Sequence, residues 1–226
     1  MDKYNVYQDM SRRTGGEIYL GIVGPVRTGK STFIKRFMEL VVIPEMSDDN
    51  EKVRTIDELP QSADGKTIMT TEPKFIPKEA AVIHFSNQET GKIRLIDCVG
   101  YLVPEAVGAI EEEKERMVKT PWSEEEIPFS KAAEIGTSKV IREHSNLGLI
   151  ITTDGSFGDI PAVNFEEALQ KTVMECEKAG KPFLILVNTS RPDSQETIQF
   201  TKRLEAQYGK TVMAVNCKTM DREDVF

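Results

Sequence analysis

The chain has 226 residues, of which 39% are hydrophobic and 29% charged, and its formal net charge is −8. A chain of this length can bury one full-sized core but not two, so we expect one main domain. The negative charge opposes a polyphosphate backbone and no local basic patch is visible, which sets nucleic acid aside as a partner.

Neither a membrane span nor a secretory signal is visible in the sequence. No apolar run approaches the roughly 20 residues that cross a bilayer, and the first ten residues lack the apolar core of a signal peptide. Cys98, Cys176 and Cys217 lie far apart in the sequence. Their odd number and wide spacing predict reduced, buried thiols in a cytosolic protein.

The first elements follow one another closely. Apolar side chains at helical spacing predict a short N-terminal helical arm over residues 1–16. Residues 18–23 are apolar, bounded by glycine and too few for a helix, which predicts a buried strand. Residues 31–42 carry apolar side chains at helical intervals until Pro44, which should end that helix. The pattern is strand, loop and helix.

The rest of the chain repeats this alternation. A polar connection over residues 45–78 precedes strands 81–86 and 92–97, which should pair as a hairpin. Further strands are predicted at 147–152, 183–187 and 211–215, and further helices at 131–144, 165–178 and 196–208. Such alternation predicts an α/β fold with a six-stranded, mostly parallel sheet and helices on both faces.

Residues 101–130 form a long insertion within the predicted domain 17–226. The segment is acidic and carries the chain's one tryptophan, Trp122, as a large aromatic anchor. A solvated loop is favoured slightly over a surface for a partner protein.

Residues 24–31 read Gly-Pro-Val-Arg-Thr-Gly-Lys-Ser, the P-loop pattern. They follow a buried strand and open an amphipathic helix, which is the context that this motif requires. The glycines let backbone N–H groups converge on phosphates at the positive end of the helix. Lys30 can reach the β- and γ-phosphates and the Ser31 hydroxyl can bind Mg²⁺. The residues predicted to contact the nucleotide phosphates are Gly24, Val26, Arg27, Thr28, Gly29, Lys30, Ser31 and Thr32. An exposed Arg27 that supports solubility is an equal alternative.

The second half of the metal site is expected where the neighbouring strand 92–97 ends. Asp97 could bind Mg²⁺ through water and the Gly100 amide could face the γ-phosphate. Thr70 and Thr71 lie where a γ-phosphate sensor would sit, and could complete the Mg²⁺ shell. The alternatives are an ordinary aspartate at a strand end and a solvated pair of hydroxyls.

The sequence at the predicted fifth strand bears on the base. Guanine-specific members of this architecture end that strand with Asn-Lys-x-Asp, whose carboxylate accepts from guanine. Here the tetrapeptide runs from Asn188 to Arg191, and an arginine presents donors to the donor edge of guanine. We therefore predict that ATP is preferred over GTP, with Asn188 and Arg191 near the base. Tyr101 stands where small GTPases carry a water-orienting glutamine, which predicts slow hydrolysis.

Several long runs resemble the N-terminal nucleotide-binding domain of the stage IV sporulation protein A family of spore-forming Firmicutes. They are residues 14–21, 27–35, 57–62, 66–75 and 151–155. The resemblance implies a fold like the translation-factor class of GTPases, with Lys30, Thr70, Thr71 and Asp97 as catalytic residues. Ser31, Thr70, Thr71 and Asp97 would hold Mg²⁺. It also implies that the family's middle and C-terminal domains are absent from this chain.

The function implied by the resemblance is ATP hydrolysis that drives irreversible self-assembly into the basement layer of the spore coat. The implied partners are further copies of the protein, other coat morphogenetic proteins and a small amphipathic membrane peptide. The implied location is the mother-cell cytoplasm, at the surface of the outer forespore membrane. A regulatory GTPase switch and a scaffold that binds nucleotide without hydrolysing it are the alternatives.

Overall fold

The computed structural model describes residues 16–60, 72–84, 90–106, 110–111 and 114–225. Its centre is a six-stranded sheet in the order β10-β9-β8-β1-β3-β2. The strands are β1 (Glu17–Val23), β2 (Lys74–His84), β3 (Thr90–Asp97), β8 (Leu147–Thr153), β9 (Phe183–Asn188) and β10 (Val212–Val215). All neighbours are parallel except β2, which runs antiparallel to β3. The predicted α/β fold and its hairpin of the second and third strands are confirmed.

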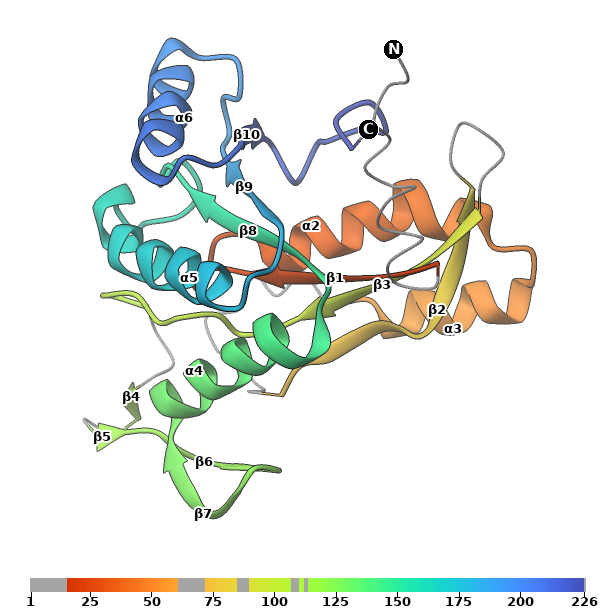
Figure 1. Ribbon diagram of the computed structural model, residues 1–226, viewed down its shortest axis with the longest axis horizontal. Helices are drawn as coiled ribbons and strands as arrows, with labels where there is room; N and C mark the ends of the chain where they lie inside the picture. The colour runs from red at the N-terminus through yellow and green to blue at the C-terminus, as the bar shows by residue number, and fades with distance from the viewer. Residues whose placement is uncertain (1–15, 61–71, 85–89, 107–109, 112–113, 226) are drawn as a thin grey trace.

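Helices cover both faces of this sheet, as predicted (Figure 1). Successive residues of β8 take opposite sides, because side chains alternate along a strand. Ile151 belongs to the cluster that contains Phe33 and Ile34 of α2 (Lys30–Phe37). Ile150 belongs to the cluster that contains side chains of α5 (Glu166–Lys178) and α6 (Gln195–Tyr208).

Two helices continue into a π-helical turn. α2 is followed by η1 (Met38–Val42) and then by the 3₁₀ helix η2 (Ile43–Glu45). The predicted helix 31–42 is confirmed, and Pro44 lies in the first turn of η2, where a missing N–H costs little. α4 (Phe129–Lys139) continues in the same way into η3 (Val140–His144).

The parallel register brings the predicted site together at one edge of the sheet. Ile22 pairs with Asp97, so the P-loop after β1 lies beside the residues that follow β3. Asn188 at the end of β9 pairs with Thr153 of β8 and with Val215 of β10. In open α/β sheets, ligands bind outside these carboxyl ends of the strands.

The polar connection predicted over residues 45–78 is wrong in part. It contains α3 (Asp49–Glu58), and β2 begins at Lys74 rather than near residue 81. The carboxylate of Asp48 caps α3 by accepting from the N–H groups of Asn50 and Glu51. In this helix only Thr55 is buried, so the apolar periodicity that reveals a helix in the sequence is missing.

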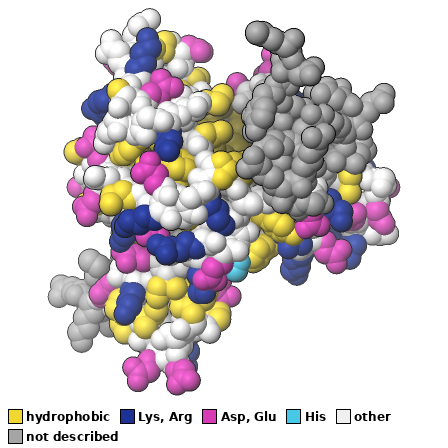
Figure 2. Space-filling model, viewed as in Figure 1, with side chains coloured by type: hydrophobic (Ala, Val, Ile, Leu, Met, Phe, Trp, Pro, Cys, Tyr) yellow, Lys and Arg dark blue, Asp and Glu magenta, His cyan; other side chains and the backbone are white. Residues whose placement is uncertain are grey.

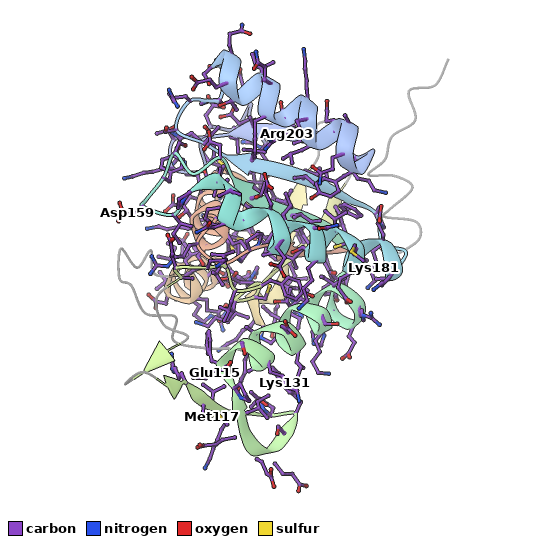
Figure 3. All side chains as sticks on the ribbon, turned by 90° about the vertical axis from the view of Figure 1, so that its left-hand side faces the viewer. Glu115, Met117, Lys131, Asp159, Lys181 and Arg203 are labelled. Atoms are coloured by element: carbon purple, nitrogen blue, oxygen red, sulfur yellow. The ribbon has the colours of Figure 1, made fainter. Side chains whose placement is uncertain are left out.

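The solvated loop favoured for residues 101–130 is also wrong, since the segment contains two small hairpins. β4 (Ile110–Glu111) pairs with β5 (Lys114–Glu115), and β6 (Met117–Thr120) pairs with β7 (Ser123–Pro128). The β6–β7 hairpin projects from the body beside α4, as the position of Met117 shows (Figures 1 and 3). Figure 2 shows hydrophobic side chains gathered in this region above a group of acidic ones.

Two smaller expectations concern the cysteines and the N-terminus. Cys98, Cys176 and Cys217 are buried and free, as predicted. The predicted helical arm lies outside the described residues, apart from Gly16. No helix in the part of the chain that the structure describes is long and apolar enough to cross a membrane.

Candidate nucleotide site

The loop between β1 and α2 has the backbone conformation that its glycines allow. Gly24 and Gly29 have φ of +131° and +92°, and a Cβ at either position would lie 2.3 Å from another atom. That atom is the carbonyl oxygen of Ile151 for Gly24 and Nδ2 of Asn188 for Gly29. Arg27, between them, is exposed and also has a positive φ, of 61°. Glycine is therefore required at both ends of the loop.

Hydrogen bonds close this loop on itself and tie it to the segment that follows β3. The N–H of Val26 donates to the carbonyl oxygen of Tyr101 at 2.9 Å. The Thr28 hydroxyl donates to the Pro25 carbonyl at 3.0 Å, and Lys30 Nζ donates to the same oxygen at 2.6 Å. At the N-cap of α2, Gly29 offers no side chain to the first N–H groups. Such a helix start, with its positive dipole end, is an anion site.

Lys30 lies at the centre of the site. Its side chain is buried at 5% exposure. Burial lowers the pKa of its ammonium group, and electrostatic interactions with Cys98 and Asp97 oppose that shift. Gly100 lies against it with φ of +93°, and a Cβ there would be 2.8 Å from Lys30 Nζ and 2.1 Å from the Gly24 carbonyl oxygen. Gly100 thus lies beside the P-loop, and the contact of its amide with the γ-phosphate stays a prediction.

Ser31 and Asp97 face each other beside Lys30. The Ser31 hydroxyl donates to Asp97 Oδ2 at 3.2 Å. The other carboxylate oxygen, Oδ1, is buried, and no hydrogen-bond partner for it occurs among the described residues. Burial raises the pKa of Asp97, against the opposing effects of Lys30 and Ser31. A buried carboxylate oxygen without a partner is costly unless a ligand completes it.

This donor set fits Mg²⁺, which prefers oxygen ligands and takes several of them from water and substrate phosphates. Groups of three or more His, Cys, Asp and Glu residues able to hold a metal are absent from the described residues. A site with one carboxylate, one hydroxyl and phosphate oxygens does not need such a group. Ser31 and Asp97 are the residues that would hold the ion.

The residues predicted to lie near the base, here called the base end of the site, lie at the ends of β9 and β10 and in the loop that follows β9. Asn188 is buried at 6% exposure, and its Nδ2 donates to the Thr28 carbonyl of the P-loop at 3.0 Å. Its Oδ1 accepts from the N–H of Cys217, also at 3.0 Å. Arg191 lies on the loop that leads to α6, and its guanidinium pairs with Glu196 at 3.1 Å. Asn188 therefore lies at the site, tied to the phosphate-binding loop.

The whole chain, residues 1–226, matches the family model described as stage IV sporulation protein A, ATPase domain. The chain belongs to this family. It is 52% identical over 225 residues to stage IV sporulation protein A of Bacillus subtilis strain 168, covering 100% of this chain and 46% of that protein. It is 48% identical over 221 residues to the protein of the same name from Clostridioides difficile strain 630, covering 98% and 45%. The chain spans about half the length of the curated relatives it matches.

Among solved structures, the G-domain of FeoB from Methanococcus jannaschii is similar over 92% of this chain and 92% of that chain. The identity is 15% and the TM-score 0.41, which is too low to support an inference. The P-loop nucleotide-hydrolase fold of this member of the sporulation family is shown instead by its own sheet order and by the loop between β1 and α2.

Tyr101 does not replace a water-orienting glutamine in this family member. Its side chain is only 3% exposed and packs with Val26, Phe165 and Ala168. Lys171 Nζ lies 4.8 Å from the centre of its ring, and burial raises the pKa of its hydroxyl. Tyr101 therefore supports the loop from behind. Thr70 and Thr71, the predicted sensor residues, lie outside the described residues and stay predictions.

Sequence reasoning missed Asp154 and its partner Thr189. The Thr189 hydroxyl donates to Asp154 Oδ2 at 2.6 Å, although the two residues are 35 apart in the sequence. A signal for Asp154 was present, because it directly follows β8 much as Asp97 ends β3. An acidic residue at the carboxyl end of a parallel strand is a candidate for the site at that edge.

Proposed function

We propose that the chain binds ATP with Mg²⁺ and hydrolyses it to ADP and phosphate. In the longer protein this hydrolysis drives self-assembly into a static polymer, the basement layer of the spore coat. The observation that carries the proposal is the contact of Ser31 with Asp97 beside Lys30, with one buried Asp97 oxygen left unpaired. The family's description as an ATPase domain supports it.

The residues of the P-loop suit the binding of a triphosphate. The uncapped N–H groups at the start of α2 and the Lys30 ammonium offer several donors in a small space. Ser31 and Asp97 hold the metal side of the site. When bound, Mg²⁺ neutralises charge on the phosphate oxygens. The Pro25 carbonyl oxygen holds the ammonium group, and Gly100 leaves room for it, because a side chain at position 100 would displace it.

The preference for ATP over GTP rests on the residues that follow β9. A guanine reader needs an acceptor at the position of Arg191, which carries only donors and is paired with Glu196. Thr189, at the position of the stacking lysine, is fully buried and turned towards Asp154. Neither residue offers the contacts by which guanine is selected.

Burial of Tyr101 favours one second candidate, a scaffold that binds nucleotide without turnover. Hydrolysis requires a group that orients the attacking water, and position 101 does not supply it. We propose that Thr70 or Thr71 supports the reaction and that turnover is slow. Phosphate release by the purified protein distinguishes the two candidates.

The proposed partners follow from the family rather than from the site. They are further copies of the protein, other spore coat proteins and a small amphipathic membrane peptide. The proposed location is the mother-cell cytoplasm at the outer forespore membrane. The family's name places it in sporulation, which supports this assignment.

The decisive experiment measures phosphate release from ATP and from GTP by the wild type, Lys30→Ala and Asp97→Ala, with sedimentation of each protein. Lys35→Ala, on the same helix, is the control for loss of a lysine charge. We expect the first two variants to lose at least about 100-fold of the release, and Lys35→Ala to retain it. Equal phosphate release from all four proteins contradicts the proposal that this site hydrolyses ATP. ATP that stays bound to the wild type without hydrolysis supports the scaffold candidate. Much faster release from GTP contradicts the adenine preference.

A further inference from the structure

Two loops at the base end of the site are joined by side chains that the proposed reaction does not use. Asp154 directly follows β8, and Thr189 directly follows β9. The register pairs Thr153 with Asn188, so the next residue of each strand stands beside the other. The hydrogen bond of 2.6 Å from the Thr189 hydroxyl to Asp154 Oδ2 closes this junction.

The hydroxyl of Thr189 is fully used inside the protein. The residue has 0% exposure. Its Oγ1 donates to Asp154 and accepts from the N–H of Arg191 at 3.2 Å and from the Ser156 hydroxyl at 3.4 Å. One donor and two acceptor positions are all that a hydroxyl has. Thr189 therefore fixes the loop that leads to α6, and its hydroxyl has no hydrogen-bonding position left for a ligand.

The carboxylate of Asp154 is bound from its own loop as well. Its Oδ1 accepts from the N–H of Ser156 at 3.0 Å, and the Ser156 hydroxyl accepts from the N–H of Ser190 at 2.8 Å. Burial alone would raise the pKa of Asp154, but hydrogen bonds from Ser156 and Thr189 outweigh it, so the net pKa is lowered. The group is a carboxylate at neutral pH, and charge strengthens both bonds.

We propose that Asp154 is a positioning residue for the nucleoside end of the bound nucleotide, acting through Thr189 on the loop that begins at Asn188. The inference rests on the proposed function, because it concerns the same site. The loop after β9 reads the base in guanine-specific proteins of this architecture. In this chain the hydrogen bond between Thr189 and Asp154 sets the conformation of that loop. Thr189 takes the position of the lysine that stacks on the base in those proteins. The phosphates are held separately, by the P-loop.

Asn188 provides the internal comparison for this proposal. Its amide bonds the P-loop directly at Thr28. The hydrogen bonds of Thr189 and Asp154 instead join the loops after β8 and β9 to each other, with further contacts from Thr189 to β10 and α6. Loss of Asn188 should disturb both ends of the site. Loss of the Asp154–Thr189 bond should disturb the nucleoside end alone.

The test measures kcat and KM for ATP, together with competitive inhibition by Mg²⁺-pyrophosphate, which reports the phosphate end without a base. Thr189→Val keeps the side-chain volume and removes the hydroxyl, Asp154→Ala removes its acceptor, and Thr189→Ser restores the hydroxyl. Asp159→Ala is the control on the same loop, since Asp159 is exposed and points away from the body (Figure 3).

We expect Thr189→Val and Asp154→Ala to raise KM for ATP about tenfold, with kcat little changed, because the freed loop must be ordered when ATP binds, at a cost comparable to the lost charge-assisted hydrogen bond. Pyrophosphate inhibition should be unchanged in both, and Thr189→Ser and Asp159→Ala should behave as the wild type. Asn188→Ala should weaken ATP and pyrophosphate together. If Asp154→Ala fails to fold, Thr189→Val and Thr189→Ser decide the matter.

An unchanged KM in Thr189→Val overturns the inference, and so does an equal loss of pyrophosphate inhibition, which would make the pair a general support of the site. These outcomes are distinct from failure of the proposed function. That failure is an absence of ATP hydrolysis in the wild type, whatever the variants do.

Discussion

The two ends of the nucleotide site differ in how their polar groups are satisfied. At the phosphate end, the first N–H groups of α2 have no side-chain cap and Asp97 Oδ1 has no partner among the described residues. At the base end, Asn188, Thr189 and Asp154 are bonded to the protein itself. Unpaired buried groups are those whose desolvation a ligand can offset. The difference therefore indicates that the phosphates supply most of the binding free energy, while the base end sets the shape of the site.

The largest expected effect comes from filling the space at Gly100. In Gly100→Ala the new Cβ would lie 2.1 Å from the Gly24 carbonyl oxygen and 2.8 Å from Lys30 Nζ. We expect ATP binding to be lost altogether, because the P-loop and its lysine must both move. Isothermal titration calorimetry with Mg²⁺-ATP measures the loss.

Gly158→Ala is the matched control for Gly100→Ala. Gly158 has φ of +88°, close to the +93° of Gly100, but nothing lies within 4 Å of its Cβ position. Both variants bear the strain of a left-handed residue, roughly 1–2 kcal/mol, and only Gly100→Ala adds the clash. Equal ATP binding by the two variants would show that the phosphate end tolerates a side chain at position 100, which would contradict the importance given to this end of the site.

Asp97→Asn is expected to lower phosphate release about 100-fold, because an amide replaces the metal-binding carboxylate. The ligand-free variant should be at least as stable as the wild type at neutral pH. The reason is that burial raises the pKa of Asp97, so its charged form is unfavourable in the folded protein. Thermal unfolding of both proteins without ligand checks whether the variant is at least as stable as the wild type. A marked loss of stability would mean that Asp97 is a structural group, and Asp159→Asn controls for the lost charge.

Asn188→Ala should reveal the connection between the two ends. The change leaves the Thr28 carbonyl and the Cys217 N–H unpaired and should cost about 2–4 kcal/mol of unfolding free energy. Asn146 makes the same two kinds of bond, to Glu17 and Tyr19 at the far end of β1. Urea unfolding should therefore show a comparable loss in Asn146→Ala, whereas ATP affinity should fall, by about tenfold, only in Asn188→Ala. A fall in both variants would trace the effect to general loosening of the sheet.

The smallest effect concerns Cys217, the buried thiol behind the base end. Burial raises the pKa of this thiol to about 12. The folded protein then holds the proton more tightly than the unfolded chain, so this contribution to stability is complete below roughly pH 8.5 and is lost as the pH rises towards 12. Between about pH 7.5 and about pH 9.5, the wild type should lose about 1 kcal/mol more unfolding free energy than Cys217→Ala. Urea unfolding at each pH measures this difference. An equal loss of unfolding free energy in the two proteins would show that the thiol is not shielded from water.

Much of the phosphate end could be predicted from the sequence because it is local. The strand, the glycine-bounded loop and the helix from Lys30 are consecutive in the chain, and each has its own pattern. Asp97 could be predicted as well, because parallel strands end at one edge. The helix α3 could not, because its exposed Val53 and Ile56 and its single buried residue, Thr55, do not give an amphipathic pattern.

The base end shows why the remainder could not be predicted. Asn188 bonds Thr28 across 160 residues, and Thr189 bonds Asp154 across 35. Such contacts depend on the order and register of β8, β9 and β10, which local patterns do not specify. The tetrapeptide that starts at Asn188 therefore indicated which base contacts were missing, but not that Thr189 is turned inwards.

The most direct test compares the binding of Mg²⁺-ATP and Mg²⁺-tripolyphosphate by the wild type and by Lys30→Ala. If the phosphate end supplies most of the binding free energy, tripolyphosphate should bind the wild type within roughly a hundredfold of ATP, and Lys30→Ala should lose at least about 100-fold of its affinity for both ligands. Undiminished ATP binding by Lys30→Ala, or no detectable binding of tripolyphosphate to the wild type, would contradict this account.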